Sequence, residues 1–246
     1  MWLDGYFSSP HDAPPRWMLM LTAYLDETGR ESKDYVFIAG HVGNEDQWKK
    51  FAEKWSAARG KRNHIHLSSL RWANLRTKKL LAALGPIPSE CGLVRVLGGV
   101  RVSDYADLIE GPRDKKALAG YYFALNGLVA QLIRWIPDNE RVELVFENQD
   151  RYRDAAGRVM NDIAAMLVNS RGLRKLAKWS FVPKGSTMLL EQADYFANAL
   201  GHLYRDEDSK KVQWTSSILG DMRGIVAISS RKQIRYVVRI GNAIKP

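Results

Sequence analysis

Three acidic residues stand at places in the sequence where carboxylates are typical of catalytic sites. Asp26 follows a long apolar run, Glu147 closes a shorter one, and Asp194 lies early in a predicted helix. Carboxylates that gather at one point repel one another, and a divalent cation such as Mg²⁺ or Mn²⁺ relieves the repulsion. Two such ions about 4 Å apart can activate a water molecule and stabilise the leaving oxygen of a phosphodiester. These residues therefore predict metal-assisted hydrolysis, with Asp26, Glu147 and Asp194 as catalytic metal ligands.

The acids can act together only if the chain brings them to one place. Residues 19–25 and 141–146 are the apolar runs that end at Asp26 and Glu147, and both are typical of buried strands. In open α/β sheets, ligands collect beyond the carboxyl ends of the strands. If these two strands are parallel neighbours, we expect Asp26 and Glu147 to lie side by side.

The rest of the pattern predicts a single α/β domain over residues 1–246, built on a mixed sheet flanked by helices. Residues 35–42 follow the first strand after a glycine-containing turn, which predicts an antiparallel hairpin. Asn44 and Gln47 predict a capping box, and residues 45–90 are expected to form a basic helical insertion after the second strand. Later runs predict strands at 93–102 and 179–182, helices at 115–135, 155–168 and 189–203, and a terminal hairpin of 225–229 with 234–240.

The formal net charge of +10 favours a polyanionic partner. Basic residues are concentrated between Lys49 and Lys79, where only Glu53 opposes them. A solvated helical face would also explain this excess, but its single sign favours a surface that faces phosphates. Nucleic acid, either DNA or RNA, is therefore the predicted partner, with Lys61 and Arg62 among its contacts.

Composition excludes several other classes of protein. The single cysteine, Cys91, excludes an intramolecular disulfide and a cysteine-rich metal site. No apolar run reaches the roughly 18–20 residues that span a bilayer, and the start of the chain lacks the pattern of a signal peptide. We therefore expect a cytoplasmic protein with no membrane partner, while protein partners and a homo-oligomer stay open.

Four stretches of the sequence together resemble one large prokaryotic family. Residues 24–29, Tyr-Leu-Asp-Glu-Thr-Gly, followed by the apolar strand 35–40, resemble the opening of the domain-of-unknown-function 3800 family. Three later stretches are similar to its further motifs: residues 64–70, His-Ile-His-Leu-Ser-Ser-Leu, the strand that ends at Glu147, and residues 190–197, Leu-Glu-Gln-Ala-Asp-Tyr-Phe-Ala. The family is placed in the ribonuclease H-like superfamily, and the resemblance covers most of the chain.

The resemblance implies a ribonuclease H-like fold with acidic metal ligands, and many relatives look like components of mobile elements or of phage defence. Two positions depart from the family pattern, because Thr28 replaces the usual serine and Glu147 stands where aspartate is commoner. Asp150 is an alternative ligand to Glu147. The long predicted helix lacks the glutamate that ribonuclease H places there. Glu27 or Glu191 would then fill that position, or the site would hold one tight metal.

Two basic residues complete the predicted site. His66, in the family-like segment, is a candidate general acid that orients water or the leaving group, with burial or phosphate binding as the alternative. Lys184 precedes the helix of Asp194. It could hold a phosphate together with the backbone amides of its loop, unless that loop only caps the helix.

The sequence thus favours a metal-dependent nuclease that hydrolyses phosphodiester bonds in nucleic acid, with Mg²⁺ or Mn²⁺ as its cofactor. The alternative is a catalytically silent ribonuclease H-like module that binds nucleic acid or a protein, which the missing helix glutamate and Glu147 would favour. A nucleotide hydrolase is a weaker third hypothesis, because the chain has no Gly-x-x-x-x-Gly-Lys-Ser/Thr phosphate loop.

Overall fold

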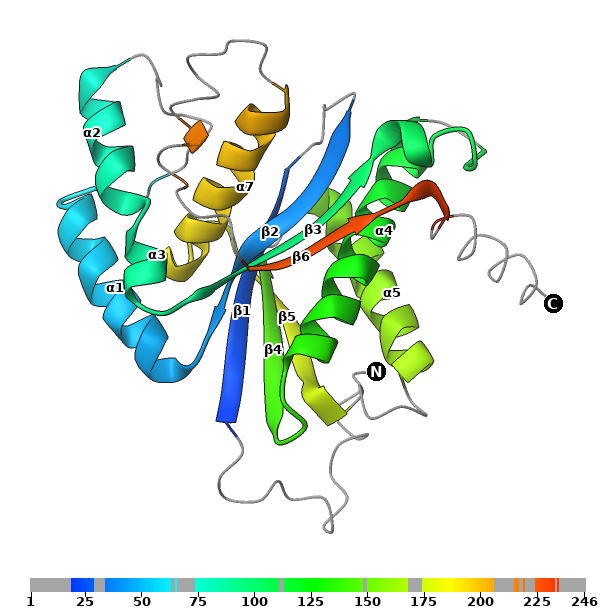
Figure 1. Ribbon diagram of the computed structural model, residues 1–246, viewed down its shortest axis with the longest axis horizontal. Coiled ribbons are helices and arrows are strands. Elements are labelled where there is room, and N and C mark those ends of the chain that lie inside the picture. Colours follow the sequence, from blue (N-terminus) through cyan, green and yellow to red (C-terminus); the bar gives the residue numbers. More distant parts are fainter. Residues whose placement is uncertain are drawn as a thin grey trace.

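A mixed sheet forms the centre of the molecule (Figure 1). The computed structural model describes residues 19–28, 34–62, 65, 74–110, 113–147, 150–167, 174–205, 215–216, 219, 224–232 and 234. The strands of this part are β1 (Leu19–Thr28), β2 (Tyr35–Gly43), β3 (Val94–Arg101), β4 (Glu140–Glu147), β5 (Leu176–Val182) and β6 (Ile225–Ser229). They lie side by side in the order β5-β4-β1-β2-β3-β6.

The sheet contains both antiparallel and parallel pairs of neighbouring strands. β1, β2 and β3 follow one another as antiparallel neighbours. β4 then runs parallel to β1, β5 runs parallel to β4, and β6 runs parallel to β3. The predicted first hairpin is confirmed, and so is the parallel pairing of the strands that end at Asp26 and Glu147.

Helices cover both faces of the sheet (Figure 1). On one face lie α4 (Arg113–Trp135) and α5 (Asp150–Leu167); on the other lie α1 (Glu45–Arg59), α2 (Leu75–Leu84), α3 (Ile87–Glu90) and α7 (Glu191–Arg205). The 3₁₀ turn η2 (Val102–Asp104) follows β3, and the 3₁₀ turn η3 (Met188–Leu190) directly precedes α7. The helices between β2 and β3 fall within residues 45–90, where the sequence predicted them. None of the described helices is both long and apolar enough to cross a membrane.

Each face of the sheet has its own apolar core. Leu25 of β1, Ile38 of β2 and Phe146 of β4 belong to the core under α4 and α5. Phe37 and Ala39 of β2 belong to the core under α1, α2 and α7. Because successive side chains of a strand point to opposite faces, residues two apart share a core. This alternation decides to which face each acidic residue is directed.

The capping box predicted at the start of α1 is confirmed. The Gln47 N–H donates to Asn44 Oδ1 at 2.9 Å, and the Asn44 N–H donates to Gln47 Oε1 at 2.8 Å. Gln47 Nε2 also donates to the carbonyl of Gly92 at 2.7 Å. The capped end of α1 is therefore tied to the segment that leads into β3.

Of the predicted terminal hairpin of residues 225–229 with 234–240, the first strand is confirmed as β6. β6 pairs with β3, and Ile234, predicted to begin the second strand, closes a helical turn in which its N–H donates to the Ser230 carbonyl at 3.0 Å. Local periodicity identified the strand, but its pairing depends on β3, which is distant in the sequence. Residues 235–240 lie outside the described residues.

Candidate active site

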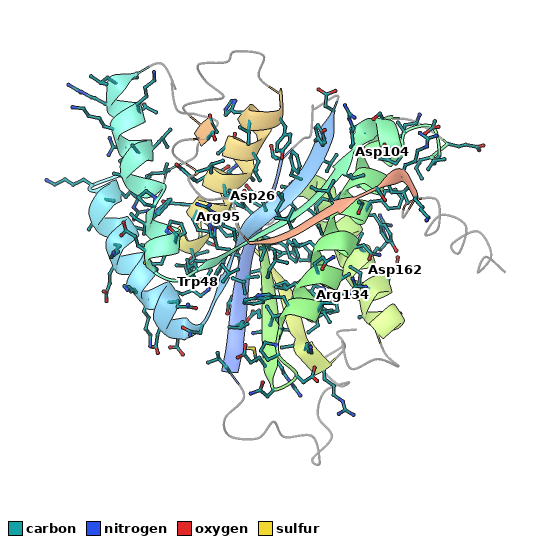
Figure 2. The ribbon with its side chains drawn as sticks, viewed as in Figure 1. Asp26, Trp48, Arg95, Asp104, Arg134 and Asp162 are labelled. Carbon is teal, nitrogen blue, oxygen red and sulfur yellow. The ribbon has the colours of Figure 1, made fainter. Side chains whose placement is uncertain are left out.

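The strand register brings Asp26 and Glu147 to one edge of the sheet. Leu25 of β1 pairs with Phe146 of β4, and the two acids are the next residues on these parallel strands. Leu25 and Phe146 both pack into the core under α4. Alternation therefore directs Asp26 and Glu147 to the α7 side. Figure 2 shows Asp26 near the middle of the molecule on that side, whereas Asp162 lies on the opposite side with α5.

α7 brings the third acid to the same side of the sheet. This helix packs across β1 and β2, and Asp194 lies in its first turn. All three carboxylates are buried, since Asp26, Glu147 and Asp194 are 5%, 8% and 7% exposed. Asn198, one turn further along α7, donates from Nδ2 to Asp194 Oδ1 at 3.0 Å. Sheet and helix thus enclose three acidic groups, one of them oriented by a neighbour on its own helix.

The pKa of Asp26 is raised by its burial and by the acids around it. Burial raises this pKa well above its usual value, and the charges of Glu27, Asp194 and Glu147 raise it further. The Glu27 N–H donates to Asp26 Oδ1 at 2.9 Å and opposes the rise, because it stabilises the charged form. A nearby cation would offset both the burial and the repulsion. The site is therefore electrostatically suited to a positive ion.

Glu27 neighbours Asp26 but belongs to the other side of β1. It pairs in register with Ile38, which packs into the core under α4, and alternation assigns Glu27 to the same side. Its charge still raises the pKa of Asp26. Of the two adjacent acids predicted to be catalytic, Asp26 is therefore the one directed toward Asp194, and Glu27 acts on it through charge.

β5 places Lys184 beside the acids. This strand ends in register with Glu147, and Lys184 Nζ lies 3.7 Å from Glu147 Oε2 with the lysine side chain 51% exposed. The loop turns at Gly185, whose φ of 71° favours glycine. It ends at Thr187, whose Oγ1 accepts the Leu189 N–H at 3.2 Å. The lysine predicted to bind phosphate thus lies at the solvent edge of the acid cluster.

Glu191, one of the alternatives for the missing helix glutamate, is engaged by α1. Its carboxylate accepts a hydrogen bond from Trp55 Nε1 at 2.8 Å and forms an ion pair with Arg59 at 2.7 Å. Its side chain is fully buried. The spacing of Glu191 and Asp194 predicted one shared helix face, but the contacts of α1 with α7 engage both Glu191 oxygens. Glu191 therefore joins two helices, and both of its oxygens are already engaged there.

The other predicted residues fall into two groups. Lys61 and Arg62 are exposed just beyond the end of α1, and Arg62 donates to the Arg59 carbonyl at 3.1 Å. Because Arg59 also binds the first residue of α7, this basic segment is anchored beside the start of the helix that carries Asp194. His66 and the side chain of Asp150 lie outside the described part of the chain.

The sequence did not identify His41 as a partner of the helix that carries Asp194. His41 is buried in β2, and its Nδ1 donates to Gln192 Oε1. Gln192 Nε2 in turn donates to the carbonyls of Leu189 at 2.9 Å and Tyr24 at 3.5 Å. Burial lowers the pKa of His41 to about 3, so the ring stays neutral. The only sign in the sequence was one histidine within an apolar strand.

These hydrogen bonds hold the start of α7 against β1. Tyr24 stands two residues before Asp26, and Gln192 stands two residues before Asp194. The neutral ring of His41 donates through Nδ1, which fixes the orientation of the Gln192 amide. Gln192 therefore sets the separation of the two catalytic candidates.

Replacing Gln192 with methionine should lower the pKa of Asp26. Methionine keeps much of the volume but removes every hydrogen bond to His41 and Tyr24, so the charge of Asp194 is held less closely. The pKa can be followed by the carboxyl ¹³C shift of labelled aspartate, with thermal unfolding as the check on folding. Asp194→Asn provides the reference, because it removes that charge outright. An unchanged Asp26 pKa in a folded Gln192→Met variant would contradict this role.

The donor set fits a hard divalent cation. Carboxylate oxygens are the ligands that Mg²⁺ and Mn²⁺ prefer, and Lys184 brings a single positive charge to the cluster. Within the described residues, no three histidine, cysteine, aspartate or glutamate side chains already form a metal-binding group. Coordination by Asp26, Glu147 and Asp194 would therefore require their side chains to turn toward one another.

No protein-family model matches this chain, and a search of curated proteins finds no match either. The resemblance to the domain-of-unknown-function 3800 family therefore stays a prediction from the motifs.

Proposed function

We propose that this protein is a metal-dependent nuclease with a ribonuclease H-like fold. The observation that carries the proposal is the convergence of Asp26, Glu147 and Asp194. These buried carboxylates come from the ends of two neighbouring parallel strands and from the first turn of α7. Hydrolysis of a phosphodiester by metal ions needs oxygen ligands in a shielded site, and these three carboxylates would supply them once their side chains turn toward one another.

The order of the strands is compatible with that fold. An antiparallel meander of β1, β2 and β3 is followed by β4 and β5, both parallel to β1, with helices on both faces. Membership of the domain-of-unknown-function 3800 family rests on the motifs at residues 24–29 and 190–197. A role in phage defence or in a mobile element rests on that resemblance alone. A cytoplasmic location is proposed from the single free cysteine, Cys91.

Each residue of the cluster has a role in this proposal. Asp26, Glu147 and Asp194 would hold Mg²⁺ or Mn²⁺, and Asn198 keeps Asp194 oriented through its hydrogen bond. The bound ion would supply an activated water molecule and stabilise the leaving oxygen. Lys184 lies at the solvent edge beside Glu147, where its ammonium group can pair with a phosphate oxygen of the substrate. Burial of the carboxylates strengthens every such charge interaction.

The basic segment at the end of α1 supports nucleic acid as the substrate. Lys61 and Arg62 are exposed there, and the Arg59–Glu191 ion pair anchors this segment to the start of α7. Contacts with phosphates give affinity with little dependence on base sequence. They also weaken as salt concentration rises, because counterions are no longer released as favourably.

The direct test is a cleavage assay on labelled single-stranded and double-stranded DNA, RNA and DNA–RNA hybrids. We expect cleavage of at least one substrate with Mg²⁺ or Mn²⁺, and none with EDTA. Metal ligands bind in their deprotonated form, and the pKa of Asp26 is raised. Cleavage at limiting metal should therefore increase with pH until Asp26 is ionised.

Two outcomes would contradict this proposal. The first is that no substrate is cut and calorimetry detects no binding of Mn²⁺. Retained binding of nucleic acid would then support the catalytically silent module. The second is cleavage that persists in EDTA, which would remove the metal from the mechanism.

A further inference from the structure

A cluster of aromatic rings lies on the same face of the sheet as the acids. Tyr35 and Phe37 of β2 stack with their ring centroids 5.4 Å apart. Tyr204, at the end of α7, lies 5.2 Å from Tyr35 and 5.1 Å from Phe37 between centroids. The Arg101 guanidinium lies over the Tyr35 ring at 5.7 Å. Phe37 is buried, but Tyr204 remains 45% exposed. One ring of the cluster therefore faces solvent.

The cluster continues across the sheet to β6. Phe37, Gly99 and Ile228 are in register on β2, β3 and β6. A Cβ atom at Gly99 would lie 2.7 Å from Phe37 Cδ1 and 2.9 Å from Ile228 Cδ1, so only glycine lets these side chains meet. Ile228 and Val226 are each 48% exposed. The aromatic surface, defined as Tyr35, Phe37, Arg101, Tyr204, Val226 and Ile228, is thus continuous and partly open to solvent.

The aromatic surface is close to the acids. Asp26 is in register with Ala39, and Tyr35 lies four residues before Ala39 on β2, which is about 13 Å at the rise of a strand. Tyr204 lies ten residues along α7 from Asp194, which is about 15 Å at the rise of a helix. A stacked single strand covers such a distance with roughly four nucleotides. One short strand can therefore reach both sites.

We propose that the aromatic surface stacks unpaired bases of a single-stranded nucleic acid, whose backbone then passes over the acids. This inference rests on the proposed nuclease function and names its substrate class. The exposed ring of Tyr204 and the plane of the Arg101 guanidinium can stack on any base, and the Arg101 charge suits the phosphate backbone. In a duplex the bases already stack on one another, so single strands gain most from such a surface. The net charge of +10 adds to this preference for a polyanion.

Abasic oligonucleotides separate stacking from charge, because they keep the phosphates and lack the bases. The probes are a fluorescein-labelled single strand of about 12 nucleotides and the same strand with abasic residues. Binding is measured by anisotropy in EDTA with the Asp26→Asn variant, so that no strand is cut. We expect this protein to bind the strand with bases roughly tenfold more tightly than the abasic strand.

Further substitutions in the same Asp26→Asn background test whether the aromatic surface causes the difference in affinity between the strand with bases and the abasic strand. Tyr204→Ala should remove most of this difference in affinity. Tyr204→Trp should keep the difference and show that the fold is intact. Trp135→Ala removes another exposed aromatic, 44% exposed at the end of α4, and should leave the difference unchanged. The dependence of affinity on salt should stay the same in all of these variants, because none changes a phosphate contact.

The proposal would be overturned if the Tyr204→Ala protein still bound the strand with bases tenfold more tightly than the abasic strand. So would self-association in sedimentation experiments that Tyr204→Ala abolishes, because the surface would then be a protein contact. These results are distinct from a failure of the nuclease proposal. In that case the stacking difference is measured and depends on Tyr204, but no substrate is cut with Mg²⁺ or Mn²⁺.

Discussion

The Asp26→Asn variant should lose metal-dependent cleavage by about 10³-fold or more and yet unfold at a higher temperature than the wild type. Loss of a ligand removes several kcal/mol of charge stabilisation from the transition state, and each 1.4 kcal/mol is about tenfold in rate. Asparagine keeps the size of the side chain and cannot ionise. It therefore removes the repulsion among the acids without opening a cavity.

The gain in stability follows from the raised pKa of Asp26. Between the pKa of the unfolded chain, about 3.9, and the raised pKa of the folded protein, the folded state binds more protons. Wild-type stability therefore falls as pH rises through this window. The Asp26→Asn variant lacks this decrease in stability, because asparagine does not ionise. The difference between the two proteins should be smallest near pH 4, grow with pH, and level off above the folded pKa.

Thermal unfolding in metal-free buffer at several pH values checks this expectation, since each kcal/mol shifts Tm by about 2–4 °C in a chain of this size. Added Mn²⁺ should stabilise the wild type and leave the variant unchanged. Asp162→Asn, an exposed change on α5, is the matched control for both stability and cleavage. An Asp26→Asn protein that cuts at the wild-type rate would exclude Asp26 as a metal ligand.

Glu191→Ala should be the most damaging change to stability near the site. It removes the carboxylate that pairs with Arg59, which is only 14% exposed, and that accepts a hydrogen bond from Trp55 Nε1. Removing one partner of a buried ion pair costs about 3–5 kcal/mol. At about 2–4 °C per kcal/mol, Tm should fall by roughly 6–20 °C.

Glu45→Ala is the matched control, because Glu45 also pairs with a cation, Lys49, but is 81% exposed. Chemical denaturation should show almost no effect of this change. Glu191→Gln should be milder than Glu191→Ala, because its amide oxygen can still accept from Trp55. It should also keep the wild-type affinity for Mn²⁺. A marked loss of that affinity in folded Glu191→Gln would restore Glu191 as a ligand.

The sequence by itself determined the strands and the placement of the acids at their ends. The apolar runs that end at Asp26 and Glu147, and the capping box of Asn44 and Gln47, depend on residues that are close in sequence. The spacing of apolar residues and the hydrogen bonds of a helix cap are both set by residues that lie within a few positions of one another. For this reason β1, β2, β4 and the start of α1 could be predicted before any contact was known.

Only the tertiary structure decided which of these acids lie near one another. Glu191 and Asp194 have the same chemistry and stand three residues apart, but Glu191 is bound by Trp55 and Arg59, 136 and 132 residues away. His41 and Gln192, which hold α7 in place, are separated by 151 residues. β6 likewise pairs with β3, a strand that is distant in the sequence. Whether a carboxylate is available as a ligand or is held as a structural partner depends on the residues that tertiary packing brings beside it. Those residues are distant in the sequence, so the local sequence does not identify them.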